Sequence, residues 1–119
     1  MKNMHVLAGE AIKDAWANKD LGLLRELIAD KLEWHEGSYD GAITTADAVI
    51  KRWSDDLAGQ TEIVVTIELL DNLESHSYHH CIASWSDNKR GKVKIDGIFL
   101  IGLDQAGKVI LFRQWWNDI

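Results

Sequence analysis

Hydrophobic side chains recur every three or four positions in the first half of the chain, a spacing typical of amphipathic helices. This pattern predicts one helix from Met4 to Asn18, a second from Leu21 to Ile28 and a third from Ala46 to Leu57. Thr44 and Asp47 have the spacing of a weak capping box at the start of the third helix. The first half of the chain is therefore expected to be mainly helical.

Beyond the third helix the hydrophobic period changes to two, which is typical of strands. Strands are predicted over residues 61–71, 76–86, 93–103 and 108–116, and a shorter strand, residues 32–36, precedes the third helix. The last two strands form a long hairpin. This order indicates an α+β fold, in which three N-terminal helices pack on one face of a curved, mostly antiparallel sheet.

One face of the predicted hairpin carries large apolar side chains with a single amide among them. Phe99 lies on this face in the first strand, and Phe112, Gln114 and Trp116 lie on it in the second. Such a face needs a cover, which the upstream helices have to supply. The hairpin is therefore the floor of either a plain core or a pocket.

Length and charge narrow the class of protein. The 119 residues suit a single domain, residues 1–119. The net charge of −6 argues against nucleic-acid and anionic-membrane partners, which need clustered Lys and Arg; Lys89, Arg90 and Lys92 are interpreted as a charged hairpin turn. The single cysteine, Cys81, excludes an internal disulfide. No apolar run has the length of a signal peptide or a membrane helix, so a cytoplasmic protein is expected.

Glu36 is a candidate for acid–base chemistry. It shares a strand face with Trp34, and the helices and the hairpin would cover that face. A partly buried carboxyl group among indole rings should have a raised pKa, which a general acid or base near neutral pH requires. The alternative is a solvated carboxylate at the sheet edge, or one paired with an arginine such as Arg113.

The histidines do not have the spacing of a metal site. His79 and His80 are consecutive and point to opposite faces, and His76 and His80 lie about 13 Å apart at roughly 3.3 Å per residue. We therefore predict no metal, and no cofactor. His80 is a candidate pocket acid if Tyr78, His80 and Ile82 face the cavity. The alternative places His80 on the outer face or at a dimer contact.

A second apolar patch is assigned to the opposite face of the sheet. It consists of Trp85, Ile98, Leu100 and Trp115. A monomer would expose this patch, and exposed apolar patches mark protein–protein contacts. The patch predicts a sheet-to-sheet homodimer.

Two segments resemble a known superfamily. The first is residues 18–37 (NKDLGLLRELIADKLEWHEG), which resembles the second helix and first strand of nuclear-transport-factor-2-like proteins, in the SnoaL-like and ketosteroid-isomerase-like branch. The second is residues 103–117 (LDQAGKVILFRQWWN), which resembles their closing hairpin. The resemblance implies a cystatin-like cone of three helices over a bent sheet, with one pocket for a small apolar ligand, and commonly a dimer. Family activities include isomerisation, epoxide hydrolysis, ring closure and dehydration, and some members only bind partners.

The resemblance also assigns roles to single positions. Glu36 falls on the position of the general base of the isomerases. Ile12 and Phe99 fall where those enzymes have a tyrosine and a protonated aspartate that stabilise the dienolate. Without either hydrogen-bond donor, steroid isomerisation by that route is not expected.

By the same resemblance, Trp53 matches a pocket phenylalanine of the third helix, and Phe112, Gln114 and Trp116 match inward positions of the last strand. Tyr39, in the turn after Glu36, would lie at the mouth, where it either hydrogen-bonds a ligand or plugs the loop against the third helix. The predicted ligand-binding residues are Ile12, Trp16, Trp34, Tyr39, Trp53, Phe99, Phe112, Gln114 and Trp116.

Three functions remain open at this point. The first is a cofactor-independent isomerase, hydrolase, cyclase or dehydratase that acts on a small apolar molecule with Glu36 as acid or base. The second is a ligand-binding protein without chemistry, and the third is a dimerisation or partner-binding module with a filled pocket. Six tryptophans favour a filled or narrow cavity, which weighs against bulky ligands such as steroids.

Overall fold

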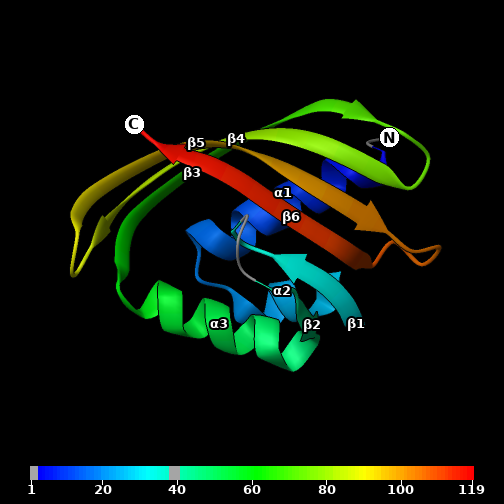
Figure 1. Ribbon diagram of the computed structural model, residues 1–119, viewed down its shortest axis with the longest axis horizontal. Coiled ribbons are helices and arrows are strands. Elements are labelled where there is room, and N and C mark those ends of the chain that lie inside the picture. The colour runs from blue at the N-terminus through cyan, green and yellow to red at the C-terminus, as the bar shows by residue number, and fades with distance from the viewer. Residues whose placement is uncertain (1–2, 38–40) are drawn as a thin grey trace.

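The computed structural model describes residues 3–37 and 41–119. In these ranges the helices are α1 (Met4–Ala17), α2 (Leu21–Leu27) and α3 (Ala46–Ala58). The strands are β1 (Ile28–His35), β2 (Ile43–Thr45), β3 (Gln60–Asn72), β4 (His76–Asp87), β5 (Gly91–Leu103) and β6 (Val109–Asp118). The predicted α+β class is confirmed, with the helices packed against one curved sheet that does not close on itself (Figure 1). None of the helices in the described part of the chain has the length and apolarity to cross a membrane.

The sheet has the strand order β2-β1-β6-β5-β4-β3. β1 runs parallel to β6, and the other neighbouring pairs are antiparallel. The predicted run of four consecutive antiparallel strands is present, and β1 adds to it beside the C-terminal strand. Because Trp34 of β1 is paired with Phe112 of β6, the end of β1 lies next to the inner face of the hairpin.

Two of the differences from the predicted boundaries have a clear physical cause. The second helix ends before Ile28, whose backbone is extended with φ −97° and ψ 148°, because this residue pairs with Val109 of β6. Thr45 rather than Thr44 caps α3, since its hydroxyl oxygen accepts a hydrogen bond of 3.2 Å from the N–H of Ala48. The short strand β2 was not predicted.

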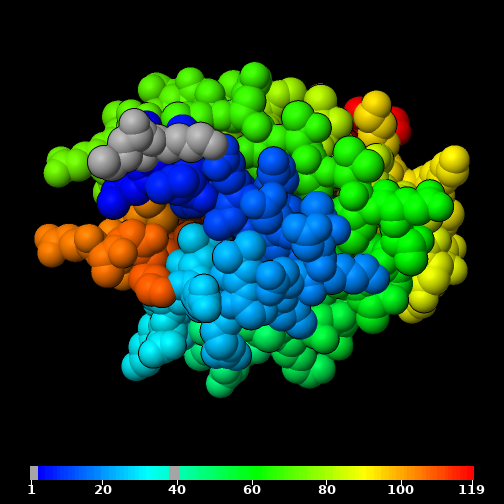
Figure 2. All heavy atoms as spheres, turned by 180° about the vertical axis from the view of Figure 1, so that it is seen from behind, coloured from blue at the N-terminus to red at the C-terminus, as the bar shows by residue number. Residues whose placement is uncertain are grey.

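The core lies between the helices and the concave face of the sheet. Its largest fully buried side chains include Ile12, Leu24, Trp34, Phe99, Ile101 and Phe112. The rings of Trp34 and Phe112 are stacked with their centroids 4.1 Å apart, and burial of each such side chain contributes about 1.5–3 kcal/mol. On the side shown in Figure 2, α1 and α2 form the centre of the surface. The predicted hairpin face is therefore the floor of the core and, at one end, of a pocket.

β4 is the strand whose inward face could not be chosen from the sequence. Its buried residues are Ser77, His79, Cys81, Ala83 and Trp85. Directly opposite residues of an antiparallel pair share a face, and Trp85 is paired with the buried Val93 of β5. The prediction that Trp85 lies on the outer face was therefore wrong.

Candidate functional site

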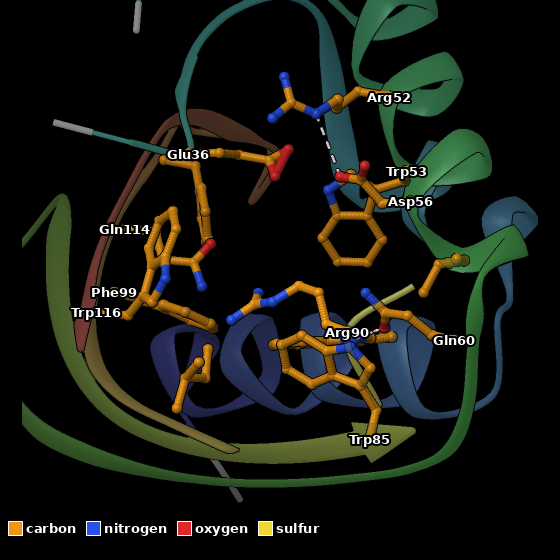
Figure 3. Close-up of a pocket in the computed structure, with 14 residues that line it drawn as sticks. Glu36, Arg52, Trp53, Asp56, Gln60, Trp85, Arg90, Phe99, Gln114 and Trp116 are labelled. Carbon is orange, nitrogen blue, oxygen red and sulfur yellow. Dashed lines mark hydrogen bonds and ion pairs between the residues drawn. The ribbon is translucent and has the colours of Figure 1, made fainter. Parts of the chain in front are cut away.

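A pocket of about 180 Å³ lies between α3, the end of α1 and the concave face of the sheet (Figure 3). Its apolar wall consists of Trp16, Trp53, Leu57, Trp85, Ile95, Phe99, Phe112 and Trp116. Its polar lining consists of Glu36, Arg52, Asp56, Gln60, Arg90 and Gln114. The pocket combines an aromatic wall with ionisable groups of both signs.

The indole rings of the wall come from different elements and pack against one another at steep angles. Trp16 of α1 lies 6.5 Å from Trp53 of α3 and 5.6 Å from Trp85 of β4, centroid to centroid, with interplanar angles of 63° and 55°. The indole N–H of Trp16 donates a hydrogen bond of 2.9 Å to the side-chain oxygen of Gln60. Aromatic pairs in such arrangements contribute about 0.5–1.5 kcal/mol beyond area burial. These contacts hold the wall in place without a ligand.

Glu36 lies directly after β1 and lines the pocket. One carboxylate oxygen accepts a hydrogen bond of 3.2 Å from the indole N–H of Trp34. Burial raises the pKa of Glu36; the Arg52 guanidinium opposes this shift, and the carboxylate of Asp56 adds to it. Arg113, the partner considered as an alternative, belongs to the opposite parity of β6 from the lining residues. Glu36 is therefore a pocket carboxyl whose charged form burial disfavours.

The other charged groups of the pocket form exposed ion pairs. Arg52 Nε donates to Asp56 Oδ2 at 3.2 Å, one turn along α3. Arg90 Nη2 donates to the carboxylate of Asp118 at 3.3 Å and 3.4 Å. Exposed pairs of this kind contribute about 0–1 kcal/mol, so a ligand can displace a partner at little cost.

Most of the predicted ligand-binding residues come together in the pocket: Trp16, Trp53, Phe99, Phe112, Gln114 and Trp116. Ile12 and Trp34 are not part of the lining and are fully buried in the core. Trp34 contacts the lining through its hydrogen bond to Glu36 and through its ring contacts with Trp53 and Phe112. Tyr39 lies outside the described residues.

His80 lies on the outer face of the sheet. Its Nε2 is 2.6 Å from a carboxylate oxygen of Asp96, and its Nδ1 is 3.6 Å from Glu68. The placement of His80 in the pocket was therefore wrong, because the other parity of β4, that of His79, faces inward. Among the residues that the structure describes, no three His, Cys, Asp or Glu side chains are grouped so that they hold a metal ion.

Four polar residues of the lining were not predicted from the sequence: Arg52, Asp56, Gln60 and Arg90. Arg52 and Asp56 are four apart and flank Trp53 on α3, so the helical spacing was a usable signal. Gln60 lies between the third helix and the strand pattern that begins at residue 61, where neither period indicates the direction of a side chain. Arg90 lies in a turn, where neither helical nor strand periodicity indicates the direction of a side chain.

A scan of the sequence against known protein families found no match, and no curated protein matched it. Solved structures do match. Protein RV0760c from Mycobacterium tuberculosis has a TM-score of 0.86 at 16% identity, covering 98% of this chain and 93% of that one. It has also been solved in complex with estradiol-17beta-hemisuccinate.

Two proteins whose names give different activities also have similar structures. Delta 5-3-ketosteroid isomerase from Mycobacterium sp. has a TM-score of 0.84 at 14% identity, covering 98% of this chain and 95% of the isomerase. A putative SnoaL-like polyketide cyclase from Jannaschia sp. CCS1 has a TM-score of 0.82 at 15% identity, covering 96% and 85%. This chain therefore has the ketosteroid-isomerase-like and SnoaL-like fold that the resemblance predicted, a fold that hosts several functions.

Proposed function

We propose that this protein binds a small, mainly apolar molecule in the pocket and that Glu36 transfers a proton to or from it. The observation that carries the proposal is a carboxyl group with a burial-raised pKa in the lining of an aromatic pocket. A raised pKa brings the exchange between the two protonation states of Glu36 closer to neutral pH, as acid–base catalysis requires.

The pocket volume favours a ligand of about one ring. A cavity of about 150 Å³ takes up benzene, whereas pockets for drug-sized ligands span roughly 300–1,000 Å³. At about 180 Å³ the pocket suits a single substituted ring. RV0760c was solved with a steroid derivative, and a steroid skeleton is larger than the pocket described here.

The reaction classes that remain are isomerisation of another kind, hydrolysis, cyclisation and dehydration. Ile12 and Phe99 are apolar and buried, so they offer no hydrogen bond to a developing oxyanion. The Gln114 amide and the Arg52 guanidinium line the pocket and supply donors for negative charge on a ligand. Glu36 is then the acid or base, and these two groups stabilise charge.

Binding is tested with benzamide, a neutral single-ring probe, by following indole N–H signals in proton–nitrogen NMR spectra. We expect saturable shifts for Trp16, Trp53 and Trp85, which line the pocket. Trp115 is the internal control, because it belongs to the opposite parity of β6. Equal shifts for all indoles, or none, contradict a binding pocket.

Proton transfer is tested with 5-nitrobenzisoxazole, whose ring opens when a base removes one C–H proton. We expect wild type to open the ring on the order of 10²-fold faster than the Glu36→Gln variant, the lower end of general-base effects. The rate should fall at low pH as Glu36 takes up a proton. Benzamide binding without this rate difference favours the second candidate function, ligand binding without chemistry.

A further inference from the structure

Arg90 is a pocket residue that the proposed proton transfer does not use. It lies in the turn between β4 and β5, where a carboxylate oxygen of Asp87 accepts hydrogen bonds from the backbone N–H groups of Lys89 (2.8 Å) and Arg90 (3.0 Å). The N–H of Asn88 donates to the carbonyl of Gly59 at the end of α3, at 2.9 Å. These bonds hold the backbone of Arg90 close to the end of α3, the helix that forms the opposite wall of the pocket.

The guanidinium of Arg90 reaches into the pocket with donors to spare. Figure 3 shows it pointing towards the Gln114 amide, on the other side of the pocket from Glu36. Within the described part of the chain its side-chain bonds go only to Asp118, and both come from Nη2. A guanidinium has five N–H donors in a fork that matches a carboxylate. Nε and Nη1 thus have capacity for a ligand.

The ion pair between Arg90 and Asp118 is weak. The side chains of Arg90 and Asp118 are 56% and 63% exposed, and their contact is long at 3.3 Å. Such a pair is screened by water and contributes little. If a ligand anion displaces Asp118, that carboxylate returns to solvent without leaving a buried charge.

The pocket carboxylates do not compete for Arg90. Asp56 accepts a hydrogen bond from Arg52, and Glu36 accepts one from the indole of Trp34. The aromatic wall leaves room for one ring between Arg90 and Glu36. A ligand that satisfies all of these groups has an apolar ring, an anionic end and a second end that faces Glu36.

We propose that the ligand belongs to the single-ring carboxylates, with its carboxylate bound by the Arg90 guanidinium and its ring held among the indoles. This inference rests on the proposed function and specifies the chemical class of the ligand. It also orients the ligand, because the carboxylate on Arg90 leaves the far edge of the ring towards Glu36. Arg90 is thereby a specificity-determining residue.

The test compares benzoate, benzamide and benzylamine, which share one ring and differ in charge, by NMR titration. In wild type we expect benzoate to bind on the order of tenfold more tightly than benzamide, the scale of one charged hydrogen bond. Arg90→Gln should remove this preference, so that benzoate binds no better than benzamide. Lys89→Gln is the matched control, since it makes the same charge change in the same turn outside the lining, and it should keep the preference.

Each other outcome decides against the inference. Equal binding of benzoate and benzamide in wild type, or a preference that survives Arg90→Gln, overturns the role of Arg90 while leaving the proposed function intact. If benzylamine binds more tightly than benzoate, the pocket prefers cations, with Glu36 and Asp56 as the anionic groups that bind them. Binding of none of the three overturns the proposed function as well. Retained benzamide binding by Arg90→Gln shows that the variant is folded.

Discussion

Glu36 is a residue whose charge opposes folding. Burial raises its pKa, so the folded state holds the proton more tightly than the unfolded state does. The stability that Glu36 contributes is present below its unfolded pKa and is lost as the pH rises through the raised folded pKa. We therefore expect Glu36→Gln, which has no charge to desolvate, to keep or raise the free energy of unfolding at pH 7, measured by urea denaturation.

A structural role for Glu36 predicts the opposite result. If an ion pair with Arg52 were the main function of the carboxylate, the Gln variant would lose about 1 kcal/mol or more. Carbon NMR titration of the Glu36 carboxyl gives an independent measurement, and it should show a pKa above that of an exposed glutamate. A destabilised variant together with an unraised pKa would remove Glu36 from the proposed chemistry.

His79 makes the fold sensitive to acid. Its side chain is 1% exposed, its Nε2 lies 2.8 Å from the hydroxyl of Ser77, and its Nδ1 is buried without a partner among the described residues. Burial, with a smaller effect of His5, lowers the pKa of His79 to about 4. The unfolded chain therefore binds a proton below about pH 6.5 that the folded chain excludes.

We expect the contribution of His79 to the free energy of unfolding to be fully present above about pH 6.5 and to be lost, by about 3 kcal/mol in total, as the pH drops towards 4. His79→Gln keeps a polar contact for Ser77, and it should reduce this loss of unfolding free energy at low pH. His76→Gln, on the same strand outside the buried set, should leave it unchanged. Urea denaturation across the pH range measures the unfolding free energy of both variants. If His79→Gln loses as much unfolding free energy at low pH as wild type does, the assignment is contradicted.

At the scale of the elements, the close approach of β5 and β6 depends on Gly97. A Cβ at this position would lie 2.2 Å from the backbone oxygen of Trp115, so β6 would have to shift. We expect Gly97→Ala to lower the free energy of unfolding by about 1–3 kcal/mol, as overpacking does. Gly41→Ala is the control, because a Cβ there meets nothing within 4 Å. Thermal denaturation that shows equal stability for both variants would contradict this account.

Elements with one clear hydrophobic period were predictable, and contacts between distant segments were not. The hairpin face that holds Phe99 and Phe112 followed from alternation alone. In β4 both parities mix polar and apolar residues, so the inward direction of Trp85 was decided by its pairing with β5. The extended state of Ile28 depends on a partner eighty-one positions away, Val109. Local periodicity carries no information about either pairing.

The residues of the site that lie on the same alternating hydrophobic face as the core could be predicted from the sequence. The aromatic wall and Gln114 lie on the predicted floor, and Glu36 was identified by its parity with Trp34. Arg90 was not, because a charged residue in a turn has the same pattern whether it faces solvent or a pocket. Which charges line the pocket follows from the path of the chain rather than from any local pattern.

At the scale of the whole molecule, the outer face of the sheet keeps several apolar side chains without Trp85. Tyr78 and Leu100 are paired across β4 and β5, and Ile98 and Trp115 across β5 and β6. Tyr78 is 40% and Trp115 is 41% exposed. Exposed apolar side chains that are adjacent in a sheet favour association.

We expect a homodimer at micromolar concentration, measured by light scattering. Trp115→Lys should shift the mass towards that of a monomer, because it places a charge in the patch. Leu7→Lys, an exposed position on α1, should not. A monomer mass for wild type would remove the dimer from consideration.

The parallel pairing of β1 with β6 has a consequence for synthesis of the protein. β1 is made before β6, yet the edge of β1 that pairs with β6 is completed only when Val109–Asp118 has left the ribosome. Until then, β1 and β5 both present open edges, which are templates for wrong pairing. The strand that leads into Glu36 therefore acquires this neighbour only after β6 has been made, and a nascent chain stalled before β6 is exposed to aggregation with the pocket still unformed.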